Sequence, residues 1–83
     1  MKTVVISIGG SALNPGKVNK PFLKSLKSTI LKLSKKHKLV LVTGGGSIAR
    51  DYISGLNDKS VYVRDVMGIH CTRLNATLLA SYL

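Results

Sequence analysis

The sequence is short of acidic and sulfur-containing side chains. Only 3 of its 83 residues are aspartate or glutamate, which leaves no paired-carboxylate or Ser-His-Asp constellation. The single cysteine, Cys71, excludes an internal disulfide and fits a reducing compartment. No run is long and apolar enough to span a membrane, and no secretion signal precedes the first apolar residues. We therefore expect one small cytoplasmic domain over residues 1–83.

Positive charge is what the chain has in excess, with a formal net charge of +10. Most of this charge lies between residues 17 and 38. We interpret this lysine-rich segment as the solvated face of a helix, which is the usual role of such a run, and we do not expect a nucleic-acid partner. The lysines concerned are Lys17, Lys20, Lys24, Lys27, Lys32, Lys35, Lys36 and Lys38.

The first half of the sequence predicts a strand, a helix and a second strand. Residues 3–8 and 39–42 are short apolar runs rich in β-branched side chains, and the second suits a strand buried on both faces. Between them, Asn19 is a candidate N-cap of a helix that runs to about His37. A βαβ unit of this kind implies a parallel pair of strands. The apolar residues of the helix recur at helical spacing, at Phe22, Leu26, Ile30 and Leu33.

Each predicted strand is followed by small residues. Residues 9–11 are Gly-Gly-Ser and residues 44–46 are Gly-Gly-Gly. Parallel strands bring such loops to the same carboxyl edge of the sheet, where α/β proteins bind ligands. Ser47 is a candidate N-cap of the next helix, and a glycine loop at a helix N-terminus presents backbone N–H groups that attract phosphate. The pattern predicts a phosphate site, with Arg50 within one turn of the glycines.

The last segment, residues 65–83, predicts a helix with apolar residues on two sides, as in helices packed between layers or against another subunit. Asp65 is either its N-cap or a ligand-binding residue, and Asn75 serves either an interface or a ligand. Adjacent His70 and Cys71 point in different directions on a helix, so we assign no metal site. The chain ends as if cut in mid-helix. The two apolar stripes are Met67, Cys71, Leu74, Leu78 and Tyr82, and Val66, Ile69, Ala76 and Leu79.

One alternative is a dinucleotide-binding Rossmann-type module. Residues 44–49 satisfy its G-x-G-x-x-G/A spacing, Asp65 lies about 20 residues further on, and residues 61–63 suit the strand that presents such an acid to a ribose. That fold normally carries the motif on its first strand, whereas a complete βα unit precedes it here. A second alternative is a basic, non-enzymatic interaction protein. A P-loop is excluded, because G-x-x-x-x-G-K-[ST] does not occur.

Three segments together resemble the amino-acid kinase superfamily, and within it the archaeal type of uridylate (UMP) kinase. They are residues 8–13 (IGGSAL), 42–52 (VTGGGSIARDY) and 65–76 (DVMGIHCTRLNA), of which the G-I-x-x-T-R-x-N-A pattern is the most specific. The resemblance implies an α/β fold, a parallel-sheet α/β/α sandwich. It also implies phosphoryl transfer from ATP to UMP with Mg²⁺, giving ADP and UDP in pyrimidine nucleotide biosynthesis, and a homo-oligomer that is a hexamer in full-length members.

The resemblance further implies roles for particular residues. Gly10, Ser11, Gly46 and Arg50 would bind ATP, while Gly45 and Asp65 would bind the phosphate and the ribose of UMP; no catalytic residue is assigned. Ser7 stands where many relatives have a lysine aimed at the phosphates. Family members are considerably longer, so the chain resembles only their N-terminal, phosphate-acceptor half. We therefore expect a truncated chain that is inactive as a kinase on its own.

Overall fold

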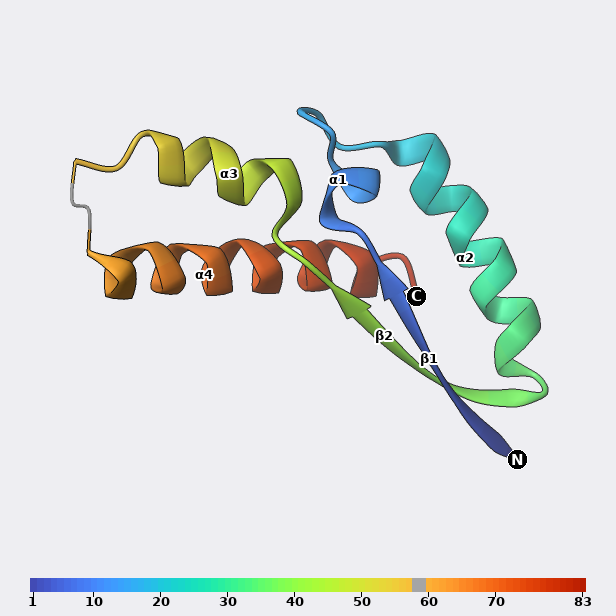
Figure 1. Cartoon of the computed structure of the whole chain (residues 1–83). Coiled ribbons are helices and arrows are strands. Elements are labelled where there is room, and N and C mark those ends of the chain that lie inside the picture. Colours follow the sequence, from blue (N-terminus) through green and yellow to red (C-terminus); the bar gives the residue numbers. More distant parts are fainter. Residues whose placement is uncertain (58–59) are drawn as a thin grey trace.

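The computed structural model describes residues 1–57 and 60–83, which form a two-stranded sheet and four helices (Figure 1). Strands β1 and β2 pair in parallel, and α2 lies between them in the sequence, which confirms the predicted βαβ unit. Asn57-Asp58 is a dipeptide that favours a turn, but Asp58 lies outside the described residues. In chain order the elements are β1 (Lys2–Ile8), α1 (Gly10–Leu13), α2 (Lys20–Ser34), β2 (His37–Thr43), α3 (Gly46–Ser54) and α4 (Val61–Ala80).

The length of α2 is set by a local cap at its start and by strand pairing at its end. The Asn19 side chain accepts a hydrogen bond from the backbone N–H of Phe22 at 3.1 Å, which confirms it as the N-cap. The helix ends at Ser34 and not near His37, because His37 already lies in β2 and pairs with Lys2. His37 is therefore a partly buried strand residue, and its expected place at the exposed end of a helix is wrong.

The core lies on one face of the sheet. Ile8 from β1 packs with Leu23 from α2 and with Leu79 from the C-terminal part of α4, and all three are buried. Ile6 and Leu41, which lie side by side in the register of the strands, are partly buried against the same cluster. This arrangement ties the end of α4 to the sheet, so that the helix crosses the molecule beside the carboxyl ends of both strands (Figure 1).

The other face of the sheet is open to solvent. Val5, Val40 and Val42 project from it with exposed fractions of 65%, 42% and 49%. The expectation that residues 39–42 are buried on both faces is therefore wrong for this chain. The physical reason is that the elements described by the structure cover only the face that carries Ile8 and Leu41.

Helix α4 begins earlier than the sequence predicts. The Ser60 side chain accepts a hydrogen bond from the N–H of Val63 at 3.2 Å and caps the helix, so Asp65 lies inside it and is not its N-cap. Of the two apolar stripes only part is buried, and both Ile69 and Leu74 are exposed. The helix ends at Ala80, three residues before the last one. In the part of the chain that the structure describes, no helix combines the length and the apolar character needed to cross a membrane.

Candidate phosphate-binding site

The two glycine runs meet at the carboxyl edge of the sheet, as the parallel pairing predicts. A Cβ atom on Gly10 would lie 2.5 Å from the carbonyl oxygen of Gly44 and 2.8 Å from the backbone nitrogen of Gly46. Gly46 has a φ of +59°, and a Cβ atom there would collide with the backbone nitrogen of Ser11. Backbones can approach this closely only without side chains, so glycine is required at both positions.

Ser11 joins the first run to the second. Its hydroxyl oxygen accepts a hydrogen bond from the N–H of Ser47 at 3.0 Å and another from the guanidinium Nη2 of Arg50 at 3.1 Å. The Ser47 hydroxyl in turn donates to the carbonyl of Asn14 at 2.9 Å. Ser47 is thus a residue of the first turn of α3 and not its N-cap, which is Gly45. Ser47 does not cap α3 because its hydroxyl and its backbone N–H are both hydrogen-bonded to the first loop.

The amides of Gly45 and Gly46 stand at the N-terminus of α3. Within residues 1–57 and 60–83, neither N–H donates a hydrogen bond to another protein group. The first N–H groups of a helix have no partner inside the helix, and they carry the positive end of its dipole. Free amides at the N-terminus of a helix attract anions such as phosphate, so this point is a candidate phosphate site.

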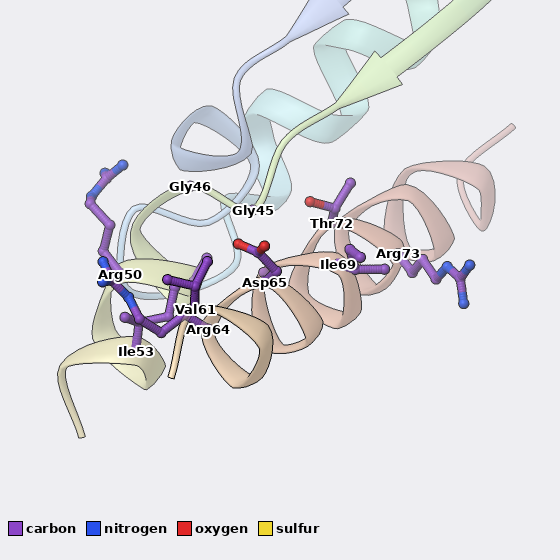
Figure 2. A pocket seen from close by; sticks show the side chains of 12 residues that line it. Gly45, Gly46, Arg50, Ile53, Val61, Arg64, Asp65, Ile69, Thr72 and Arg73 are labelled. Carbon is purple, nitrogen blue, oxygen red and sulfur yellow. The ribbon is translucent and has the colours of Figure 1, made fainter. Parts of the chain in front are cut away.

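Gly45 and Gly46 line a groove between α3 and α4 with a volume of about 860 Å³. Gly45 and Gly46 line one wall, and Asp65 from α4 lines another. Figure 2 shows the Asp65 carboxylate directed toward the two glycines, whereas the Arg73 side chain points away from them. Arg50 also lines the groove, so the groove carries both a positive and a negative side chain.

The structure thus brings the six site residues predicted from the sequence into one region. Gly10 and Ser11 do not line the groove themselves, but they contact its glycine wall and hold Arg50. Asp65 reaches the same groove from the other helix. The structure shows that these residues lie near one another, whereas the ligand that each of them contacts stays a prediction.

The described residues do not form a Mg²⁺ site by themselves. No group of three or more His, Cys, Asp or Glu side chains gathers in this part of the chain, and the groove offers one carboxylate, Asp65. Proteins usually hold Mg²⁺ with one or two carboxylates together with the phosphates of the substrate. With one carboxylate, the groove would hold Mg²⁺ only together with the phosphates of the substrate, and we assign none of these residues to a metal.

Asn75 is the important residue that is missing from the predicted site. It lies on α4 with 1% of its surface exposed, and its amide nitrogen donates to the carbonyls of Gly44 at 2.8 Å and Gly45 at 3.3 Å. The signal that points to it is its place in the G-I-x-x-T-R-x-N-A pattern. Nearby, the Thr43 hydroxyl donates to the carbonyl of Thr72 at 3.4 Å, so α4 supports the glycine loop at two points.

A parallel βαβ unit with glycine loops at its carboxyl edge defines an α/β protein of the kind that binds ligands at that edge. The model of the amino acid kinase family matches residues 2–83. The chain therefore belongs to the amino acid kinase family, and its fold is the N-terminal part of that family's α/β domain.

Curated uridylate kinases are similar to the chain along nearly all of its length. The one from Methanospirillum hungatei is 42% identical over 85 residues, which cover 100% of this chain and 36% of the relative. Those from Thermoplasma acidophilum and Thermococcus kodakarensis are 42% and 38% identical over 82 residues, 96% of this chain and 35% and 36% of the relatives. The chain thus spans about a third of the length of these relatives. The strand that the dinucleotide-binding alternative needs at residues 61–63 is instead the first turn of α4.

Proposed function

We propose that residues 1–83 form the phosphate-binding part of a uridylate kinase, which transfers the γ-phosphoryl group of ATP to UMP. The observation that carries the proposal is the meeting of the two glycine runs beside the free amides of Gly45 and Gly46. The similarity to curated uridylate kinases supports UMP as the acceptor. Pyrimidine nucleotide synthesis is the process that such a reaction serves.

Each predicted residue has a role that its chemistry suits. Gly10, Ser11, Gly46 and Arg50 face the phosphates of ATP, and Gly45 binds the phosphate of UMP through its backbone N–H. The Asp65 carboxylate accepts hydrogen bonds from the ribose hydroxyls of UMP. Four of these residues, Gly45, Gly46, Arg50 and Asp65, line the groove at the N-terminus of α3, and Ser11 is hydrogen-bonded to Arg50.

These roles are positioning and charge stabilisation, which make up most of what a protein contributes to phosphoryl transfer. In the transition state, negative charge is spread over the oxygens of the transferring group. Fixed N–H groups and the Arg50 guanidinium stabilise that charge without reorganising, because the hydrogen bond of Arg50 to Ser11 already holds the guanidinium in place.

The chain alone is expected to lack appreciable kinase activity. It corresponds to 36% of the Methanospirillum hungatei relative, and the remainder of such an enzyme supplies the pocket for the ATP base and further catalytic groups. Complete enzymes of this kind assemble as homo-oligomers, and the exposed Leu74 on α4 offers apolar surface for such a contact.

The test is a chimera in which residues 1–83 replace the matching N-terminal third of the Methanospirillum hungatei uridylate kinase. We expect the folded chimera to release ADP from ATP only when UMP is present, and the 83-residue chain to release none. A chimera that folds, as judged by circular dichroism, but shows no UMP-dependent ADP production would contradict the proposal. ADP production by the isolated chain would contradict only its expected inactivity.

Calorimetric titration of the chain separates the proposal from its two rivals. We expect UMP to bind more tightly than uridine, because the amides at the N-terminus of α3 recognise the phosphate. NAD binding tighter than UMP would favour a dinucleotide-binding module. Tight binding of duplex DNA that disappears when lysines of α2 are neutralised would favour a basic interaction protein.

A further inference from the structure

Asn75 is a polar residue in the buried part of α4, where an apolar residue would pack without any need for hydrogen bonds. Its side chain has 1% of its surface exposed. A buried amide is stable only when it is hydrogen-bonded, and the Asn75 amide uses its nitrogen to donate to the carbonyls of Gly44 and Gly45. Both bonds therefore reach from α4 into the glycine loop, 30 and 31 residues away in the sequence.

These two carbonyls determine where two amides point. In a planar trans peptide the C=O and N–H groups point in opposite directions, and the structure contains no cis peptide among its described residues. Gly44 C=O shares its peptide plane with the N–H of Gly45, and Gly45 C=O shares its plane with the N–H of Gly46. Holding both carbonyls toward Asn75 therefore turns both N–H groups away from it.

The affected amides are the ones without a partner elsewhere in the described residues. The carbonyl of Gly45 also accepts the N–H of Ala49 at 3.3 Å, which fixes the second peptide plane from the side of α3. Within residues 1–57 and 60–83 the carbonyl of Gly44 accepts no backbone N–H, and it makes the shorter bond to Asn75, at 2.8 Å. Asn75 thus matters most for the amide of Gly45.

Building on the proposed function, we propose that Asn75 is a positioning residue for phosphate binding. It touches no ligand; it fixes the peptide planes of the glycine loop so that the amides of Gly45 and Gly46 present their hydrogens to an anion. The same nitrogen would lie 2.9 Å from a Cβ atom on Gly10, so Asn75 stands where both glycine runs meet.

The experiment compares Asn75→Ala and Asn75→Asp with Leu79→Ala in the 83-residue chain. Leu79 is 3% exposed, lies one turn further along α4, and has an apolar side chain that cannot hydrogen-bond to the glycine loop. Aspartate keeps the size of asparagine but cannot donate through the lost amide nitrogen. Binding of UMP and of inorganic phosphate is measured by amide NMR, and unfolding by urea is followed on the same samples.

We expect both Asn75 variants to weaken phosphate and UMP binding about tenfold, the worth of one orienting hydrogen bond, and to shift the Gly45 and Gly46 amide signals before ligand is added. Leu79→Ala should lower the urea midpoint but leave both affinities within about twofold. If an Asn75 variant loses stability and still binds phosphate as tightly as Leu79→Ala does, its role is structural only and the inference is wrong.

Failure of the inference can be told from failure of the proposed function. If the wild-type chain binds inorganic phosphate at Gly45 and Gly46, and the Asn75 variants do not, the positioning role stands even when UMP binds no better than phosphate. If Asn75→Asp does not fold, because its buried carboxylate faces two carbonyl oxygens, Asn75→Ala decides the question. If neither UMP nor phosphate moves the two glycine amides of the wild-type chain, both the site and the positioning role are refuted.

Discussion

Gly10→Ala tests whether the close approach of the two loops holds the site together. Gly10 is the first residue of α1, and helix propensity alone predicts that alanine there is more favourable by about 1 kcal/mol. The structure predicts the opposite sign. The new Cβ atom would lie 2.5 Å from the carbonyl oxygen of Gly44 and 2.9 Å from the amide nitrogen of Asn75, whereas ordinary contacts begin at 3.4 Å.

The loss of stability expected for Gly10→Ala depends on which atoms the new Cβ atom displaces. None of the atoms that the Cβ atom meets is at the end of a flexible exposed side chain, because two belong to the backbone and the third to the buried Asn75. Overpacking of this kind costs about 1–3 kcal/mol, and losing the hydrogen bond from Asn75 to Gly44 adds about 1 kcal/mol. We therefore expect Gly10→Ala to lower the free energy of unfolding by about 2–4 kcal/mol.

Gly9→Ala is the matched control. Gly9 precedes Gly10, has a φ of −61°, and a Cβ atom on it would meet nothing within 4 Å. Its substitution should change stability by less than about 1 kcal/mol. Urea unfolding followed by circular dichroism measures both variants, and the midpoint of Gly10→Ala should fall by at least about 1 M relative to that of Gly9→Ala. Equal midpoints would show that the two glycine runs are not packed against each other.

Three further substitutions test other parts of the structure by the same unfolding assay. Gly46→Ala should lower the free energy of unfolding more than Gly16→Ala does. The backbone angle φ is positive at both glycines (+59° and +136°), but only the Cβ atom at Gly46 would meet backbone atoms. Equal losses of stability would contradict the packing of the two loops. Leu23→Ala, at 0% exposure, should cost about 2–5 kcal/mol, whereas Leu31→Ala on the same helix, at 46%, should cost less than about 1 kcal/mol. Ser11→Ala should lower the free energy of unfolding by about 1 kcal/mol, because it removes the hydroxyl that joins the two loops. An unchanged urea midpoint would argue against that link.

The sequence predicts the parts of the fold that depend on local chemistry or on topology. Asn19 caps α2 because its short polar side chain can accept an N–H three residues later, and the sequence alone shows this. The meeting of the glycine runs follows from topology, since parallel strands must end at the same edge of the sheet. Gly10 and Gly46 could thus be placed together before any coordinates were known.

The errors arise where contacts distant in sequence decide the structure. The dinucleotide-binding alternative takes residues 61–63 as a strand because Val61 and Val63 are β-branched, yet the cap from Ser60 starts α4 at Val61. The G-I-x-x-T-R-x-N-A pattern singles out Asn75, but not its partners, which lie about 30 positions away in the glycine loop. The exposure of Val40 depends on which elements cover the sheet, and the chain matches only about a third of its relatives' length.

The most direct test of the phosphate site at Gly45 and Gly46 is an amide NMR titration of the 83-residue chain with UMP. Uridine, which lacks only the phosphate, is the control. Free N–H groups at the N-terminus of α3 should take up the phosphate. We therefore predict that the signals of Gly45 and Gly46 move on addition of UMP and stay in place on addition of uridine. Signals that stay in place with UMP, or that move equally with uridine, would contradict the assignment of this edge of the sheet as a phosphate site.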